Sequence, residues 1–128
     1  MTMLKRRPIQ REHSEQTALF RWAAMNQKKY PELWALYAVP NAARRSPRQG
    51  AWMKAEGLKA GVPDIILPVP RGTYGALYIE LKAGKGTCTP AQLQWHSFLR
   101  ELGNRVEVCR GWNATANVIE KYLQGIDW

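Results

Sequence analysis

The sequence is poor in cysteine and has no long apolar run, and each shortage excludes a class of protein. Its two cysteines, Cys88 and Cys109, lie far apart, with neither CxxC spacing nor a disulfide-dense pattern. This arrangement does not support a zinc site, and it predicts two free, buried thiols. No stretch approaches the roughly 18 apolar residues needed to cross a membrane. We therefore expect a soluble, cytoplasmic protein with no membrane partner.

Histidine is scarce as well, which limits the hydrolytic chemistries open to the chain. Neither His13 nor His96 lies in a nucleophile-elbow context, so a serine or cysteine hydrolase is poorly supported. His96 falls on the side of a predicted helix that we expect to be exposed. We interpret it as a surface residue rather than a general base, and we predict no small-molecule substrate.

Acidic residues are few, and the resulting excess of positive charge is concentrated in the amino-terminal half of the chain. Residues 1–60 hold twelve Lys and Arg against four acids, a net charge of +8, whereas residues 61–128 hold seven against six, a net charge of +1. A positive field of this kind suits a polyanion, either nucleic acid or an anionic membrane, although solubility alone also explains it. The basic segment 44–59 lacks the wide apolar face of an amphipathic membrane binder, which favours nucleic acid.

Turn, cap and periodicity signals divide the chain into alternating helices and strands. The expected order is helix, strand, helix, two strands, helix, strand, helix, which predicts an α/β fold with a central mixed sheet flanked by helices. We expect a mobile basic arm over residues 1–12 and one compact domain over residues 13–125. The predicted elements are helices over 15–28, from 47 to about 57, 90–102 and 114–123, and strands over 33–39, 65–69, 76–81 and 105–110.

Two acids and a lysine lie in or beside apolar runs that are typical of buried strands. On the second strand of the central pair, Glu80 and Lys82 share one face, because successive side chains point to opposite sides. Asp64 precedes the first strand of that pair. Taken singly, Glu80-Leu81-Lys82 also fits a surface strand with alternating charge, and Asp64 fits a turn. Together, two neighbouring buried carboxylates repel unless a cation neutralises them, and oxygen ligands suit Mg²⁺ or Mn²⁺.

These residues also carry a resemblance to a known family. GVPD at 61–64, followed after fifteen residues by ELK at 80–82, resembles the PD-(D/E)XK nuclease signature. The continuation, GKG at 84–86 with Thr89-Pro90, Gln92 and Trp95, is similar to the virus-type replication-repair nuclease (VRR-NUC) branch. The similarity extends from about Glu15 to Leu123, so it implies a restriction-endonuclease-like PD-(D/E)XK fold over nearly the whole chain.

The resemblance implies metal-dependent hydrolysis of DNA phosphodiesters. Asp64, Glu80, the Leu81 carbonyl and Glu15 would bind Mg²⁺ or Mn²⁺, and Lys82 would stabilise a hydroxide or the charge developing at phosphorus. Viral members of the family cut branched DNA such as four-way junctions as homodimers, so we expect those partners here. The alternatives are a basic DNA-binding module that does not cut, and a nickase or nuclease acting on other nucleic acids.

Several of these assignments have simpler structural explanations. Glu15 would complement a helix dipole, Asn41 would serve a turn, and Gln92 would complete a capping box with Thr89, as well as orienting a water or phosphate oxygen near Lys82. Trp52 would stack on an exposed base or, as we expect, pack against the protein. The predicted DNA-binding residues are Asn41, Arg44, Arg45, Arg48, Lys54 and Lys85.

Overall fold

The computed structural model describes residues 8–40 and 46–128 and confirms the expected order of elements. It adds a short 3-10 helix, η1, before the first strand. The elements in chain order are α1 (Pro8–Met25), η1 (Pro31–Ala35), β1 (Tyr37–Ala38), α2 (Pro47–Ala55), β2 (Ile65–Leu67), β3 (Leu77–Lys82), α3 (Pro90–Glu101), β4 (Arg105–Arg110) and α4 (Trp112–Leu123).

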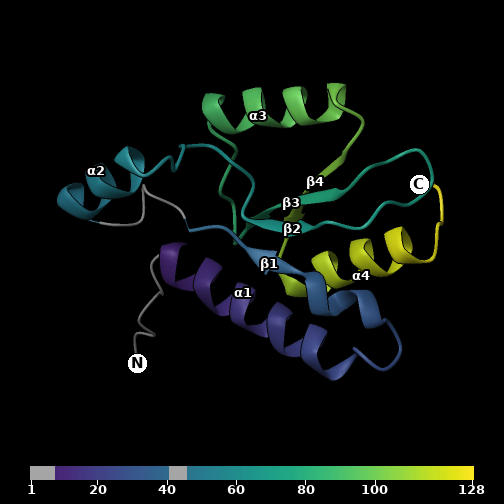
Figure 1. Cartoon of the computed structure of the whole chain (residues 1–128). Helices are drawn as coiled ribbons and strands as arrows, with labels where there is room; N and C mark the ends of the chain where they lie inside the picture. Colours follow the sequence, from purple (N-terminus) through teal and green to yellow (C-terminus); the bar gives the residue numbers. More distant parts are fainter. Residues whose placement is uncertain (1–7, 41–45) are drawn as a thin grey trace, which may run out of the picture.

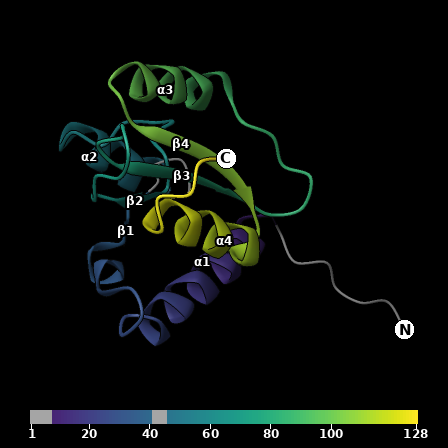
Figure 2. The same ribbon diagram turned by 90° about the vertical axis from the view of Figure 1, so that its right-hand side faces the viewer.

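A four-stranded mixed sheet in the order β1-β2-β3-β4 forms the middle layer. The β1/β2 and β2/β3 pairs are antiparallel, and β3 pairs with β4 in parallel through the crossover helix α3. Helix α3 covers one face of the sheet, and α1 and α4 cover the other (Figures 1 and 2). This is the predicted α/β arrangement.

The core fills the space between the sheet and the α1/α4 layer. Strand β3 directs Leu77, Ile79 and Leu81 into this core, where they join Leu19 of α1 and Ile119 of α4. All five side chains are almost completely buried, and each such burial contributes roughly 1.5–3 kcal/mol. Because side chains alternate along a strand, the other face of β3 presents its polar residues to α3.

The amino-terminal elements differ from the predicted ones in two places. Helix α1 begins at Pro8, so the expected arm over residues 1–12 is wrong at least for 8–12. The strand expected over 33–39 is mostly η1, and only Tyr37 and Ala38 pair with β2. Leu33 and Leu36 are buried while Trp34 between them is exposed. That spacing of three fits a 3-10 turn rather than a strand.

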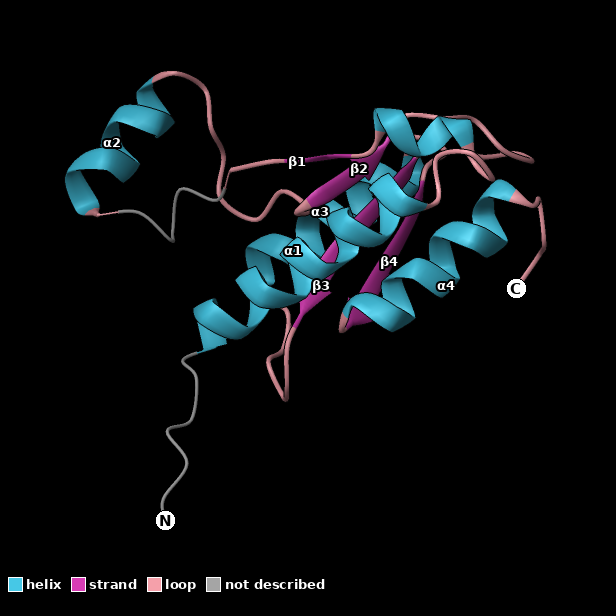
Figure 3. Ribbon diagram, turned by 90° about the horizontal axis from the view of Figure 1, so that it is seen from below, coloured by secondary structure: helices cyan, strands magenta, loops and turns pink. Residues whose placement is uncertain are grey.

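Helix α2 stands away from the three-layered body at the left of Figure 1, and again in the view from below (Figure 3). Its start is the predicted one, because Ser46 caps it by accepting a hydrogen bond from the Gln49 backbone N–H and Pro47 occupies its first turn. Its side chains form no apolar face, and only Gly50 is buried. Without such a face, the helix has little to bury against the sheet.

Candidate active site

Asp64 and Glu80 face each other across neighbouring strands. Ile65 pairs with Ile79, so extending the antiparallel register by one residue places Asp64 opposite Glu80. Directly opposed residues share a face of the sheet. Their exposed fractions are 4% for Asp64 and 1% for Glu80, and the Leu81 backbone N–H donates a hydrogen bond of 2.9 Å to Asp64 Oδ2. The fold therefore brings the two acids together in a buried position, as the sequence indicated.

Gln92, in the first turn of α3, connects the lysine to the acid. Its Oε1 accepts hydrogen bonds from Lys82 Nζ at 3.0 Å and from the Thr89 backbone N–H at 2.8 Å. Its Nε2 donates to Glu80 Oε2 at 3.4 Å. The predicted capping box is present, and the same amide that completes it also contacts Lys82 and Glu80. Gln92 thus satisfies the local helix end and the buried polar cluster at once.

His96 was expected on the surface, and that expectation is wrong. Its exposed fraction is 1%, and its Nε2 lies 3.4 Å from Glu80 Oε1. The signal was present in the sequence, because His96 follows Gln92 by four residues and so shares its face of α3. Burial lowers the pKa of His96 below its usual 6.5, Arg100 and Lys82 lower it further, and Asp64 opposes them. A neutral ring beside an ionised Glu80 would carry its proton on Nε2, because an ionised carboxylate only accepts hydrogen bonds.

The donor set fits a hard divalent cation better than zinc. Within residues 8–40 and 46–128, no three His, Cys, Asp or Glu side chains lie together as a metal-binding group. The four-ligand pattern of a structural zinc site is therefore not met among them. Mg²⁺ typically uses one or two carboxylates and completes its shell with water and substrate phosphate oxygens. Asp64 and Glu80, with the Leu81 carbonyl close in sequence, meet that requirement.

Glu15 has a structural role that the sequence did not suggest. Its Oε2 accepts a 2.7 Å hydrogen bond from the Trp112 backbone N–H, at the first residue of α4. Gly111 is the N-cap of this helix, with φ 83°, so the helix begins at Trp112, two residues before the predicted start at residue 114. The Gly111 N–H donates to the Lys82 carbonyl at 3.0 Å, which places Glu15 near the end of β3. Its role as a metal ligand stays a prediction.

The predicted DNA-contact residues are only partly described. Arg48 and Lys54 are exposed on α2, and Lys85 is exposed just after β3. Asn41, Arg44 and Arg45 lie outside the described residues. Arg110 Nη1 donates to the carbonyls of Gly84 and Gly86 at 3.1 and 2.5 Å, so the loop that carries Lys85 is tied to the end of β4. Lys85 therefore lies just after the end of β3 that carries Glu80 and Lys82, whereas Arg48 and Lys54 lie on α2, which stands away from the body of the protein (Figure 1).

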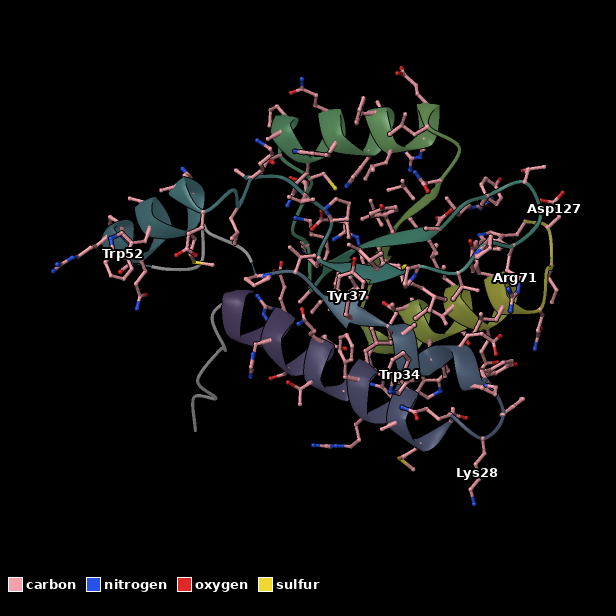
Figure 4. The ribbon with its side chains drawn as sticks, in the orientation of Figure 1. Lys28, Trp34, Tyr37, Trp52, Arg71 and Asp127 are labelled. Atoms are coloured by element: carbon pink, nitrogen blue, oxygen red, sulfur yellow. The ribbon has the colours of Figure 1, made fainter. Side chains whose placement is uncertain are left out.

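A separate hollow of about 390 Å³ lies at the opposite end of the sheet, beside Arg71 and Asp127 (Figure 4). Its two arginines already have partners. Arg71 pairs with Glu32 at 2.7 Å, and Arg105 pairs with Glu107 at 2.6 Å while stacking over Trp128. This hollow therefore offers no unpaired cation to a ligand among the described residues, and it is distinct from the buried acid pair.

Comparisons with known proteins agree with this arrangement. The family model of the VRR-NUC domain matches residues 5–113. A solved structure described as a VRR_NUC domain protein is 30% identical, with a TM-score of 0.77, and the match covers 97% of this chain and 94% of that one. A comparison with curated proteins found no match. In the described part of the chain, every helix is too short or too polar to span a bilayer.

Proposed function

This chain belongs to the VRR-NUC family of nuclease-type domains, and on that basis we propose that it is a metal-dependent endodeoxyribonuclease acting on branched DNA such as four-way junctions. One observation carries the proposal. Two acids and a lysine, with exposed fractions of 4%, 1% and 7%, lie buried together at one end of the central strands β2 and β3. Such a cluster is costly to fold unless a ligand uses it.

Asp64 and Glu80 would hold Mg²⁺ or Mn²⁺ together with the Leu81 carbonyl. When bound, the ion supplies positive charge that makes a water molecule more acidic and polarises the phosphate. Gln92 and His96 fix the two oxygens of Glu80 from the α3 side. Partners of this kind orient a ligating carboxylate before the substrate arrives.

Lys82 would act on the reacting phosphate. Its ammonium is held by Gln92 Oε1 at 3.0 Å, on the same face of β3 as Glu80. From there it stabilises either the attacking hydroxide or the negative charge that builds up as the new P–O bond forms and the bond to the leaving oxygen breaks. One water molecule is consumed: its hydroxyl joins phosphorus, and the leaving oxygen takes a proton from solvent water in place of the one that the attacking water releases, so the products are a phosphate monoester and a hydroxyl.

The basic side chains around the site would bind the DNA backbone. Arg48, Lys54 and Lys85 are exposed, and the formal net charge of +9 provides long-range attraction for a polyanion. We further propose that the protein acts as a homodimer, because a twofold axis presents two equivalent sites to paired strands of a junction. Light scattering at micromolar concentration tests the dimer, and a stable monomer with full junction cleavage would refute it.

A cleavage panel tests the function. Linear duplex, single strand, flap and four-way junction are each incubated with Mg²⁺, Mn²⁺ or EDTA. We expect metal-dependent cutting of the junction and no cutting in EDTA. Asp64→Asn and Glu80→Gln should each abolish cleavage while preserving folding, because each replacement amide oxygen still accepts a hydrogen bond. Binding without cutting under every condition would favour a basic DNA-binding module instead.

A further inference from the structure

Helix α2 is carried on a loop that leaves and rejoins the sheet beside the candidate active site. Strand β1 ends at Ala38, which pairs with Ile65, and the Val39 backbone N–H donates to the Asp64 carbonyl at 2.8 Å. The chain therefore departs from β1 and returns to β2 next to Asp64. Any DNA whose phosphate lies at the acid pair is consequently close to the base of this loop.

The return segment is also fixed to the catalytic layer. Gly61 has φ 89°, and a Cβ placed on it would lie 2.8 Å from the Ala91 backbone carbon, in the first turn of α3. Ala91 precedes Gln92, which holds Lys82. The segment that follows α2 thus packs directly against the turn of α3 that positions Lys82. The connection between α2 and the sheet is therefore fixed beside the candidate active site.

The outer part of α2 is open to solvent and carries an exposed aromatic ring. Trp52 has an exposed fraction of 71%, so the expectation that it packs against the protein is wrong. Figure 4 shows it on α2, the helix that stands away from the sheet. Arg48 lies one helical turn before it, which places a guanidinium and the indole on one face. Residues 46–60 hold three basic side chains against one acid.

This helix is a weak one by itself. It has nine residues, with Gly50 as the fourth, whereas isolated helices shorter than about 12–15 residues are marginal in water. A contact outside the described body of the protein would stabilise it. A segment of net charge +2 that carries an exposed indole is complementary to nucleic acid that offers a phosphate and an accessible base, because aromatic rings stack on any base while cations bind the backbone.

We infer that Trp52 stacks on an unpaired or unstacked base of the DNA whose phosphate occupies the Asp64–Glu80 site. Helix α2 thereby selects DNA in which base stacking is interrupted, as at a branch point or flap, over an intact duplex. In a continuous duplex each base is covered by its neighbours, so the indole has no base face to contact. The inference rests on the proposed function, since it assigns a substrate class to that site.

Binding to a cleavage-inactive protein tests this directly. Fluorescence anisotropy in EDTA measures the affinity of the Glu80→Gln protein for a four-way junction and for a linear duplex of the same sequence. Adding Trp52→Leu should weaken junction binding roughly 5- to 150-fold and leave duplex binding nearly unchanged. Trp52→Phe, which keeps an aromatic ring, should lose less. Trp34→Leu is the matched control, because Trp34 is 81% exposed on η1 and carries no role here.

A base analogue reports the stacking itself. With 2-aminopurine at the branch point, binding should change its fluorescence, and Trp52→Leu should remove that change. Equal losses for junction and duplex, or no loss for either, would overturn the inference. So would conversion of a dimer into a monomer by Trp52→Leu, which would make Trp52 a subunit contact. If the Glu80→Gln protein with Trp52 unchanged binds neither DNA, the proposed function fails. If it binds DNA and the added Trp52→Leu substitution leaves the affinity unchanged, only this inference fails.

Discussion

Replacing Lys82 by methionine should lower the rate of DNA cleavage without weakening metal binding, which separates the two properties. Methionine keeps an unbranched apolar stem but removes the ammonium, and Gln92 Oε1 retains the Thr89 N–H as a partner after the substitution. Removing one donor that stabilises transition-state charge costs about 10²–10³ in rate, or roughly 2.7–4 kcal/mol. We expect kcat and kcat/KM to fall together by that factor, since the interaction matters most in the transition state.

The assay is single-turnover cleavage of a labelled four-way junction at several Mn²⁺ concentrations. The Mn²⁺ concentration at half-maximal rate should rise by no more than about threefold, because neither candidate carboxylate ligand is changed. Lys121→Met serves as control, since Lys121 is exposed in the last turn of α4. Thermal unfolding of both variants checks that they are folded. A Lys82→Met protein that retains a tenth or more of the wild-type rate would refute the assigned role.

Three further predictions concern the surroundings of the site. His96→Leu should weaken Mn²⁺ binding about 10- to 100-fold in calorimetry. His96→Gln should retain most of the affinity, because its amide can still donate a hydrogen bond to Glu80. Equal losses of affinity in the two variants would contradict an orienting role for His96. Gly61→Ala should lower the unfolding free energy by roughly 1–3 kcal/mol more than Gly57→Ala in urea titrations, because both glycines have positive φ but only Gly61 meets backbone within 3 Å. Cys109 is buried as expected, whereas Cys88 is only half-buried, so the expectation of two buried thiols is wrong for Cys88. Burial raises the pKa of the Cys109 thiol to about 11, so a thiol reagent at pH 8 should modify Cys88 alone in the native protein and both thiols in denaturant. Two native thiols that react at similar rates would contradict the burial of Cys109.

Features encoded by neighbouring residues were predictable from the sequence. The start of α3 depends on a cap, a proline and a glutamine within four positions, and Thr89 and Gln92 form that box. The strand pair depends on apolar runs with turns between them, and Asp64 and Glu80 meet because strand alternation and hairpin register are short-range properties. The buried acid pair was therefore within reach of sequence reasoning.

Features that depend on distant contacts were not predictable in the same way. The first backbone N–H of α4 donates to Glu15, which lies 97 residues away, so the start of this helix does not depend on a side-chain cap from a neighbouring residue. The burial of His96 depends on which face of α3 docks on the sheet, a property of tertiary packing. Likewise, Trp52 is exposed because the loop that carries α2 projects from the sheet, which composition alone does not reveal.

The central claim is that Asp64 and Glu80 jointly hold one hard cation together with DNA. Titrating Mn²⁺ into the cleavage-deficient Lys82→Met protein with saturating junction DNA, followed by electron paramagnetic resonance of the free ion, measures this directly. We expect saturable Mn²⁺ binding that is lost when Asp64→Asn and Glu80→Gln are added to Lys82→Met. Unchanged Mn²⁺ binding after both acids are neutralised would contradict it.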